Sequence, residues 1–423
     1  MFTTLRTLAV FTALVAAAPA PAPKFVKIES TTLPTVHTAN PDSLNNPNKA
    51  PADPSAVLGN QLVEYAVNIT LGIPGQPFSV QIDTGSSDLW VKSDGSSGAF
   101  NKKASSTFQE DVPNGFAIAH GDKTSAIGDW VKDTINIGGV SIDQYSIDQY
   151  EFAMATQTNT DPVFGIGYPS NEASYVNNLG NGDQFQYDNL PIRLAKDGFI
   201  NTPAYSLYLD SLQSQTDSLL FGAVDTSKFT GGLALLPFIK DEPSDPSPRE
   251  FQVPRVSSVA TKNQVDGFTN INITYNCQGQ KIVVPINQLF IPLNDSNGNQ
   301  LYITINGSDE PAYSFLVGDN GSNSGQSVLG DGFLRSAYVV YDLKNNQAAT
   351  GQVNYNGGAE NLKEIDSNDI PSATAAPSVA TWTADNDITS DYATATTQYS
   401  AHPSGQSSGN DPFGRDPFGS LGF

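Results

Sequence analysis

One short stretch of this chain has the residue types needed for acid–base chemistry. Asp83 is followed at once by Thr84, Gly85 and Ser86, and Trp90 stands close behind. Asp83 supplies a carboxylate, a side chain that can accept or donate a proton in general acid–base chemistry. Gly85 allows the backbone to turn tightly beside this carboxylate. The Ser86 hydroxyl can donate a hydrogen bond to Asp83. The combination of Asp and Gly alone is a weak signal, because both residues are common in ordinary turns.

The residues around this stretch predict the elements that must hold it. Residues 64–71 alternate apolar and polar types, residues 72–76 have turn composition, and residues 78–82 again place apolar side chains at alternate positions. This pattern predicts a β-hairpin whose second strand delivers Asp83 into a loop. Throughout the chain, glycine and proline separate short runs of β-branched and aromatic residues, so the sequence favours a mostly β protein.

The complete string 83–91 resembles the active-site loop of the pepsin-like aspartic proteases, in particular secreted fungal enzymes of the yapsin and candidapepsin type. Further segments resemble the family's strand beside the loop, its helix at the lobe edge, its joining strands and its closing segment: 164–168, 187–200, 204–209, 220–228, 327–331 and 333–342. The resemblance covers roughly residues 60–357. It implies an all-β, bilobal pepsin-like fold with a cleft between the lobes and a second lobe that is incomplete.

The resemblance also implies a chemistry and the roles of residues. In this family two aspartates share a proton; one activates water, and the other protonates the developing oxyanion. Asp83 corresponds to the first of them, and Thr84, Gly85, Ser86 and Trp90 support its loop. The implied activity is that of a secreted aspartic endopeptidase acting on polypeptides in acid, without a metal or a cofactor.

The flap hairpin that covers substrate in this family corresponds here to His120, Gly121 and Asp122. His120 stands where the family has tyrosine. A histidine is charged in acid, so one interpretation is that it disturbs the aspartate pair or favours acidic side chains in the substrate. The other interpretation is an exposed histidine at the hairpin tip without catalytic consequence.

The second catalytic aspartate is not found. Asp266 precedes a glycine without the required Thr or Ser between them, and the triplet at Asp295 lacks the glycine. Either an exon between Phe251 and Asn272 is missing from the coding sequence, or the gene has decayed. In the second case the chain is an inactive pseudoprotease that binds peptides. A third arrangement, a homodimer that pairs two first lobes, is disfavoured because the second-lobe closing segment is present.

Charge and cysteine content limit the remaining functions. The chain has 43 acidic and 21 basic residues and a formal net charge of −22, which disfavours binding to nucleic acid and to anionic membranes. Its single cysteine, Cys277, cannot form an internal disulfide, so secretion is argued from the apolar N-terminus and five glycosylation sequons. We expect a glycosylated zymogen that is monomeric and without a membrane anchor, either released or associated with the cell wall.

The sequence predicts five successive segments. They are a signal peptide at 1–18, a pro-segment or leader at 19–60, an N-terminal lobe at 61–210, a truncated C-terminal lobe at 211–357, and a disordered tail rich in Ser and Thr at 358–423.

Overall fold

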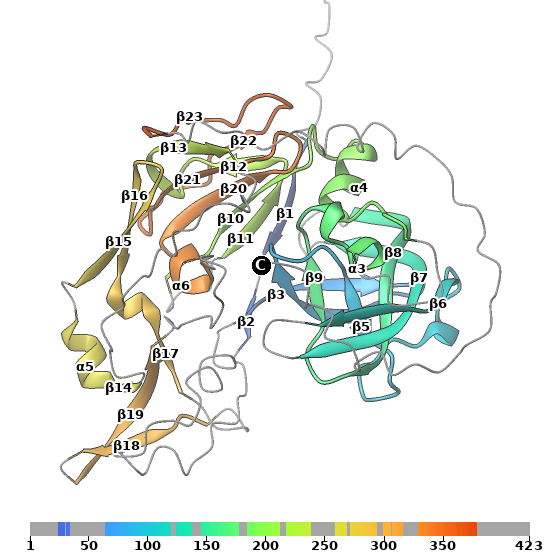
Figure 1. Cartoon of the computed structure of the whole chain (residues 1–423), viewed down its shortest axis with the longest axis horizontal. Coiled ribbons are helices and arrows are strands. Elements are labelled where there is room, and N and C mark those ends of the chain that lie inside the picture. The colour runs from blue at the N-terminus through green and yellow to red at the C-terminus, as the bar shows by residue number, and fades with distance from the viewer. Residues whose placement is uncertain are drawn as a thin grey trace, which may run out of the picture.

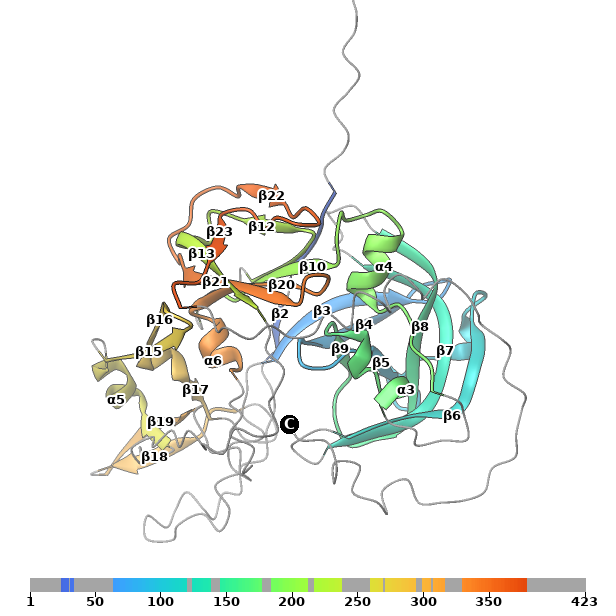
Figure 2. The ribbon, with the colours of Figure 1, turned by 45° about the horizontal axis from the view of Figure 1, so that its top comes forward.

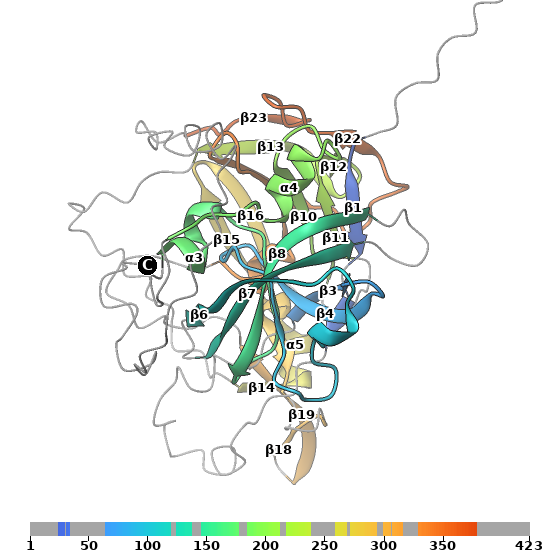
Figure 3. The same ribbon diagram turned by 90° about the vertical axis from the view of Figure 1, so that its right-hand side faces the viewer.

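The structure is a computed structural model of the 423-residue chain. It describes residues 24–29, 31–33, 64–119, 124–137, 145–176, 184–211, 217–237, 259–268, 271–293, 299–305, 307–315 and 329–378. Figure 1 shows two β-rich lobes side by side, and Figure 3 shows the first lobe facing the viewer. The predicted all-β bilobal fold is confirmed.

The first lobe is built on an eight-stranded sheet in the order β5-β8-β7-β3-β4-β9, with β2 paired to β3 and β6 paired to β7. Its strands are β2 (Thr31–Leu33), β3 (Glu64–Leu71), β4 (Gln76–Asp83), β5 (Trp90–Lys92), β6 (Gln109–Ala119), β7 (Ser125–Ile137), β8 (Tyr145–Thr158) and β9 (Val163–Gly165). Its helices are the 3-10 helices η1 (Lys102–Ala104) and η2 (Pro169–Asn171), together with α3 (Ala173–Val176) and α4 (Leu190–Lys196).

The predicted hairpin is present, because β3 and β4 pair antiparallel with Val67 opposite Val80. Val67, Ile69 and Leu71 are buried on one face, whereas the other face carries the buried Ala66 and the exposed Asn68.

A seven-stranded sheet, in the order β1-β11-β10-β20-β21-β13-β23, forms the base of the second lobe. Its strands are β1 (Val26–Glu29), β10 (Ala204–Tyr208), β11 (Ser218–Phe221), β13 (Phe229–Pro237), β20 (Ala337–Asp342), β21 (Gln347–Val353) and β23 (Ala373–Ala375). Strand β10 therefore belongs with second-lobe strands, although its residues fall inside the predicted first lobe.

The rest of the second lobe consists of small sheets and short helices. Its strands are β12 (Ala223–Asp225), β14 (Val259–Thr261), β15 (Asn272–Cys277), β16 (Gln280–Pro285), β17 (Phe290–Pro292), β18 (Tyr302–Ile305), β19 (Ser308–Phe315) and β22 (Leu362–Glu364). Its helices are α5 (Lys262–Gly267), the 3-10 helix η3 (Ile286–Leu289) and α6 (Asp331–Leu334). Figure 2 shows α6 on the inner side of this lobe, toward β3.

The chain ends differ from the sequence-based prediction. Residues 358–378, assigned to the disordered tail, contain β22, which pairs with β12, and β23, which pairs with β13. Ile365 and Ile370 are buried in this stretch, so the tail boundary at 358 was wrong. The prediction for 379–423 and the predicted signal peptide at 1–18 lie outside the described residues.

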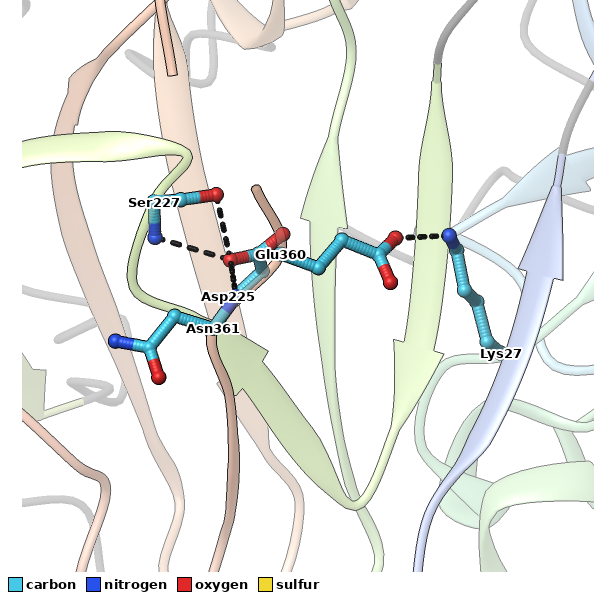
Figure 4. Close-up of polar contacts among 5 residues, drawn as sticks. All are labelled: Lys27, Asp225, Ser227, Glu360 and Asn361. Carbon is cyan, nitrogen blue, oxygen red and sulfur yellow. Dashed lines mark hydrogen bonds and ion pairs between the residues drawn. The ribbon is translucent and has the colours of Figure 1, made fainter. Parts of the chain in front are cut away.

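Part of the predicted leader is also folded. Strand β1 pairs antiparallel with β11, and Val26 and Ile28 are buried in the main core. Lys27 on this strand forms an ion pair with Glu360 (Figure 4). The adjacent backbone N–H of Asn361 donates to Asp225 at 3.0 Å, which ties the 360 region to the end of β12.

Candidate active site

Asp83 is the last residue of β4 and lies where the first sheet meets the second lobe. Strand β9 runs parallel to β4 with Gly165 opposite Asp83, and the N–H of Ile166 donates to the Asp83 carbonyl at 3.0 Å. The N–H of Gly85 donates to Asp83 Oδ1 at 2.8 Å. This tight turn holds one carboxylate oxygen in place and leaves the partly exposed side chain accessible.

The loop after Asp83 wraps closely around β9. The N–H of Gly165 donates to the carbonyl of Asp88 at 2.9 Å, and the N–H of Gly167 donates to that of Ser86 at 2.8 Å. A Cβ atom at Gly165 would lie 2.4 Å from the backbone nitrogen of Asp88 and 2.5 Å from that of Ser87. Only glycine fits there, and the expectation that segment 164–168 threads beside the aspartate loop is confirmed.

Asp88 anchors the far end of the loop from inside the first lobe. Its side chain is 1% exposed and accepts hydrogen bonds from the N–H of Ala173 at 2.9 Å and from the hydroxyl of Tyr187 at 2.8 Å. Burial raises the pKa of Asp88 to about 6, and these two hydrogen bonds oppose the rise. The loop is therefore fixed to α3 and to the segment before α4.

The other predicted loop residues have the following surroundings. The Ser86 hydroxyl is buried without a hydrogen-bond partner within the described part of the chain, so its expected bond to Asp83 is not formed, and the N–H of Gly85 takes that place. Trp90 is fully buried against Phe116, with ring centroids 6.5 Å apart, and its indole N–H also has no partner in those ranges.

The second lobe reaches Thr84 through Tyr341 on β20. The Tyr341 phenol interacts with the Thr84 side chain and stacks on Tyr205, with ring centroids 5.1 Å apart. Burial raises the pKa of Tyr341, the interaction with Thr84 opposes that rise, and the charge of Asp83 adds to it. A side chain from the opposite lobe thus contacts the aspartate loop directly.

The predicted flap residues His120, Gly121 and Asp122 lie outside the described residues. The structure does show the two strands that lead into and out of this segment, β6 and β7, with Ala119 paired to Ser125.

The second-lobe aspartates considered from the sequence do not complete the site. Asp266 lies on the exposed surface of α5, where it pairs with Lys262 at 2.8 Å, and Asp295 is outside the described residues. Asp331, the first residue of α6, instead interacts electrostatically with Asp83. It belongs to the closing segment recognised in the sequence, but no role was assigned to it there.

The described residues contain no group of three or more His, Cys, Asp or Glu side chains that could hold a metal ion. Within the same ranges, no helix is long and apolar enough to cross a membrane.

Known proteins resemble the chain in both sequence and fold. The family model described as eukaryotic aspartyl protease matches residues 64–268 and 259–353. An acid protease of Saccharomycopsis fibuligera is 34% identical over 335 residues, which cover 70% of this chain and 83% of the relative. Candidapepsin-3 of Candida albicans is 34% identical over 343 residues, 70% of this chain and 81% of the relative.

The solved aspartic proteinase of Irpex lacteus has the same fold, with a TM-score of 0.56 and 19% identity over 80% of this chain and all of the other. Three observations identify the family. The structure has two lobes, Gly165 lies beside the aspartate loop, and the family model matches most of the described chain. The chain belongs to the eukaryotic aspartyl protease family, whose members are aspartic endopeptidases.

Proposed function

We propose that this protein is a secreted endopeptidase that cleaves peptide bonds in acid, with Asp83 as the base that activates water. The observation that carries the proposal is the geometry of the Asp83 loop. One carboxylate oxygen is fixed by the N–H of Gly85 at 2.8 Å, and the side chain stays partly exposed at the junction of the lobes. A fixed, accessible carboxylate is what general-base catalysis requires.

Secretion is supported by the apolar N-terminus and by relatives that carry the name secreted aspartic protease. Two of the five sequons, at Asn68 and Asn272, lie on exposed strand positions where a glycan can be attached. Association with the cell wall is the alternative to free release.

Peptide cleavage by the purified full-length chain between pH 3 and pH 6 tests the proposal. Wild type should cleave an unfolded protein substrate and should be blocked by a statine-type inhibitor. Asp83→Asn should lower kcat by about 100-fold or more, because the amide keeps the shape of the carboxylate but cannot accept the proton. The matched control is Asp266→Asn, which removes an exposed carboxylate on α5 and should leave kcat unchanged.

The second candidate function is that of an inactive pseudoprotease that binds peptides. It is favoured by the missing Asp-Thr/Ser-Gly motif of the second lobe. Under this alternative, wild type would bind a labelled inhibitor or peptide without cleaving any substrate, and a transcript sequenced between the codons for Phe251 and Asn272 would contain no additional exon.

A further inference from the structure

The short helix α6 brings a second-lobe carboxylate to the junction of the lobes. Asp331 is its first residue and follows Gly330 directly. Figures 1 and 2 both place α6 on the inner side of the second lobe, toward β3 of the first lobe. Asp331 is less buried than the residues that follow it in α6, which are buried.

Side chains from both lobes hold α6 in this position. Arg335 is fully buried, and its Nη2 donates to the carbonyl of Gln288 at 2.7 Å. Across the junction, Tyr65 of β3 interacts with Arg335 and with the charges of Asp331 and Asp217. Tyr65 precedes Ala66, which pairs with Gln81, so it lies at the end of the hairpin where β4 delivers Asp83.

Asp331 and Asp83 belong to opposite lobes, and their charges interact. Burial raises the pKa of Asp331 to about 6; the Arg335 guanidinium opposes this rise, while the charges of Asp83 and Asp217 add to it. In the acid range expected for activity, Asp331 is mostly protonated and can donate a proton.

Two buried hydroxyls in this neighbourhood point to a polar ligand. Tyr205 is fully buried, and the charge of Asp83 helps to raise the pKa of its phenol. The Tyr205 hydroxyl has no hydrogen-bond partner among the described residues. The same holds for the hydroxyl of Ser86 in the aspartate loop. Buried hydroxyls are normally hydrogen-bonded, and a water or a substrate carbonyl bound beside Asp83 would supply the partner.

We propose that Asp331 is the second catalytic carboxylate of this chain and takes the role for which no Asp-Thr/Ser-Gly motif is present. The inference rests on the proposed endopeptidase function. Asp83 takes a proton from water as the water oxygen bonds to the peptide carbonyl carbon, and Asp331 gives its proton to the carbonyl oxygen. As the C–N bond breaks, Asp83 passes its proton to the leaving nitrogen. Asp331 recovers its own proton as the C=O bond re-forms.

The test compares four variants of the full-length protein with wild type: Asp83→Asn, Asp331→Asn, Asp331→Glu and Asp197→Asn. The readouts are kcat and KM from pH 3 to pH 7, together with the thermal midpoint Tm. Asp197→Asn is the matched control, because Asp197 also stands four residues from an arginine on a short helix, with Arg193 Nε at 2.9 Å, but in the first lobe.

Asp331→Asn should lower kcat by about 100-fold or more with little change in KM, because the missing proton donor acts in the chemical step. Asp331→Glu should keep a titrating limb in its activity profile, because it keeps a carboxyl group, while kcat falls about tenfold or more, because that group is displaced. Asp197→Asn should behave as wild type.

Two outcomes separate this inference from the proposed function. If Asp83→Asn is inactive while a folded Asp331→Asn keeps more than a tenth of wild-type kcat, Asp331 is not the second carboxylate and the endopeptidase function stands. If wild type cleaves nothing at any pH, both proposals fail. Should Asp331→Asn not fold, a folded Asp331→Glu with wild-type kcat would overturn the assignment of Asp331.

Discussion

Gly165 is the position in the site with the least room for a side chain. In Gly165→Ala, the new Cβ atom would meet backbone nitrogens at 2.4 Å and 2.5 Å, and backbone cannot move aside as a flexible side chain can. We expect a loss of about 2–3 kcal/mol or more in the free energy of unfolding, together with loss of activity. Chemical denaturation measures the first quantity. Gly267→Ala is the control, because nothing lies within 4 Å of its Cβ position; equal stability of the two variants would contradict the packing argument.

Asp88 makes the stability of the protein depend on pH. Its pKa in the folded state, about 6, lies above the ordinary value of 3.8, so the folded state holds a proton that the unfolded state releases. The contribution of Asp88 to the free energy of unfolding is fully present below about pH 4. It is lost as pH rises through about 6, and the total loss is up to about 3 kcal/mol. Asp88→Asn keeps a neutral side chain that can accept from the N–H of Ala173 and donate to the Tyr187 oxygen.

Urea denaturation of wild type and Asp88→Asn at pH 4, 5, 6 and 7 checks this expectation. The variant should show a shallower fall in stability over that range. Parallel curves for the two proteins would show that Asp88 does not titrate there. Part of the fall should remain in the variant, because burial also raises the pKa of Glu151 and Glu172.

At the residue level, the sequence predicts Asp83 and the neighbours that shape its loop, because those residues are adjacent in the chain. The sequence does not single out Asp331, which we propose as the partner of Asp83. Asp331 interacts with Arg335 and Tyr65 across the lobe junction, and no local spacing encodes these contacts. The predicted hydrogen bond from Ser86 to Asp83 was wrong. The backbone N–H of Gly85 donates to the carboxylate instead, and the Ser86 hydroxyl does not.

Among the elements, β22 and β23 give a direct test of where the folded body ends. A chain that ends at Ser378 keeps both strands, whereas one that ends at Gly357 loses them together with the buried side chains of Ile365 and Ile370. Each fully buried isoleucine contributes about 1.5–3 kcal/mol, so the shorter chain should be less stable by several kcal/mol. Urea denaturation of both truncations measures the difference. Equal midpoints would mean that the two strands add nothing to stability.

The β3–β4 hairpin and the tail show why some elements are predictable and others are not. The hairpin strands are close in sequence and alternate clearly between apolar and polar residues, so pattern and structure agree. The tail strands are three residues long, and their partners, β12 and β13, lie more than a hundred residues earlier in the chain. Their polar composition resembles a disordered segment, and only tertiary pairing makes them strands.

At the scale of the whole molecule, one hydrophobic cluster extends through both lobes, and each lobe also has a smaller cluster of its own. The largest cluster of buried side chains runs from Phe164 of the first lobe to Leu207 and Val339 of the second-lobe sheet. Calorimetry at pH 5 should therefore show one unfolding transition. Asp88→Asn in the first lobe and truncation at Gly357 in the second should both shift that transition. Two separated peaks, each moved by only one of the changes, would show that the lobes unfold independently.

The position of β1 also has a consequence for how the protein is made. This strand emerges early from the ribosome, but its register partner for Val26 is Phe221, and the ion-pair partner of Lys27 is Glu360. Contacts so distant in sequence form slowly, because a long loop must close first. The first lobe can fold while synthesis continues, but the seven-stranded sheet of the second lobe is not complete until β23 has been translated. Until β11 has been translated, β1 has no partner strand, and in this interval its apolar face is open to wrong contacts in the nascent chain.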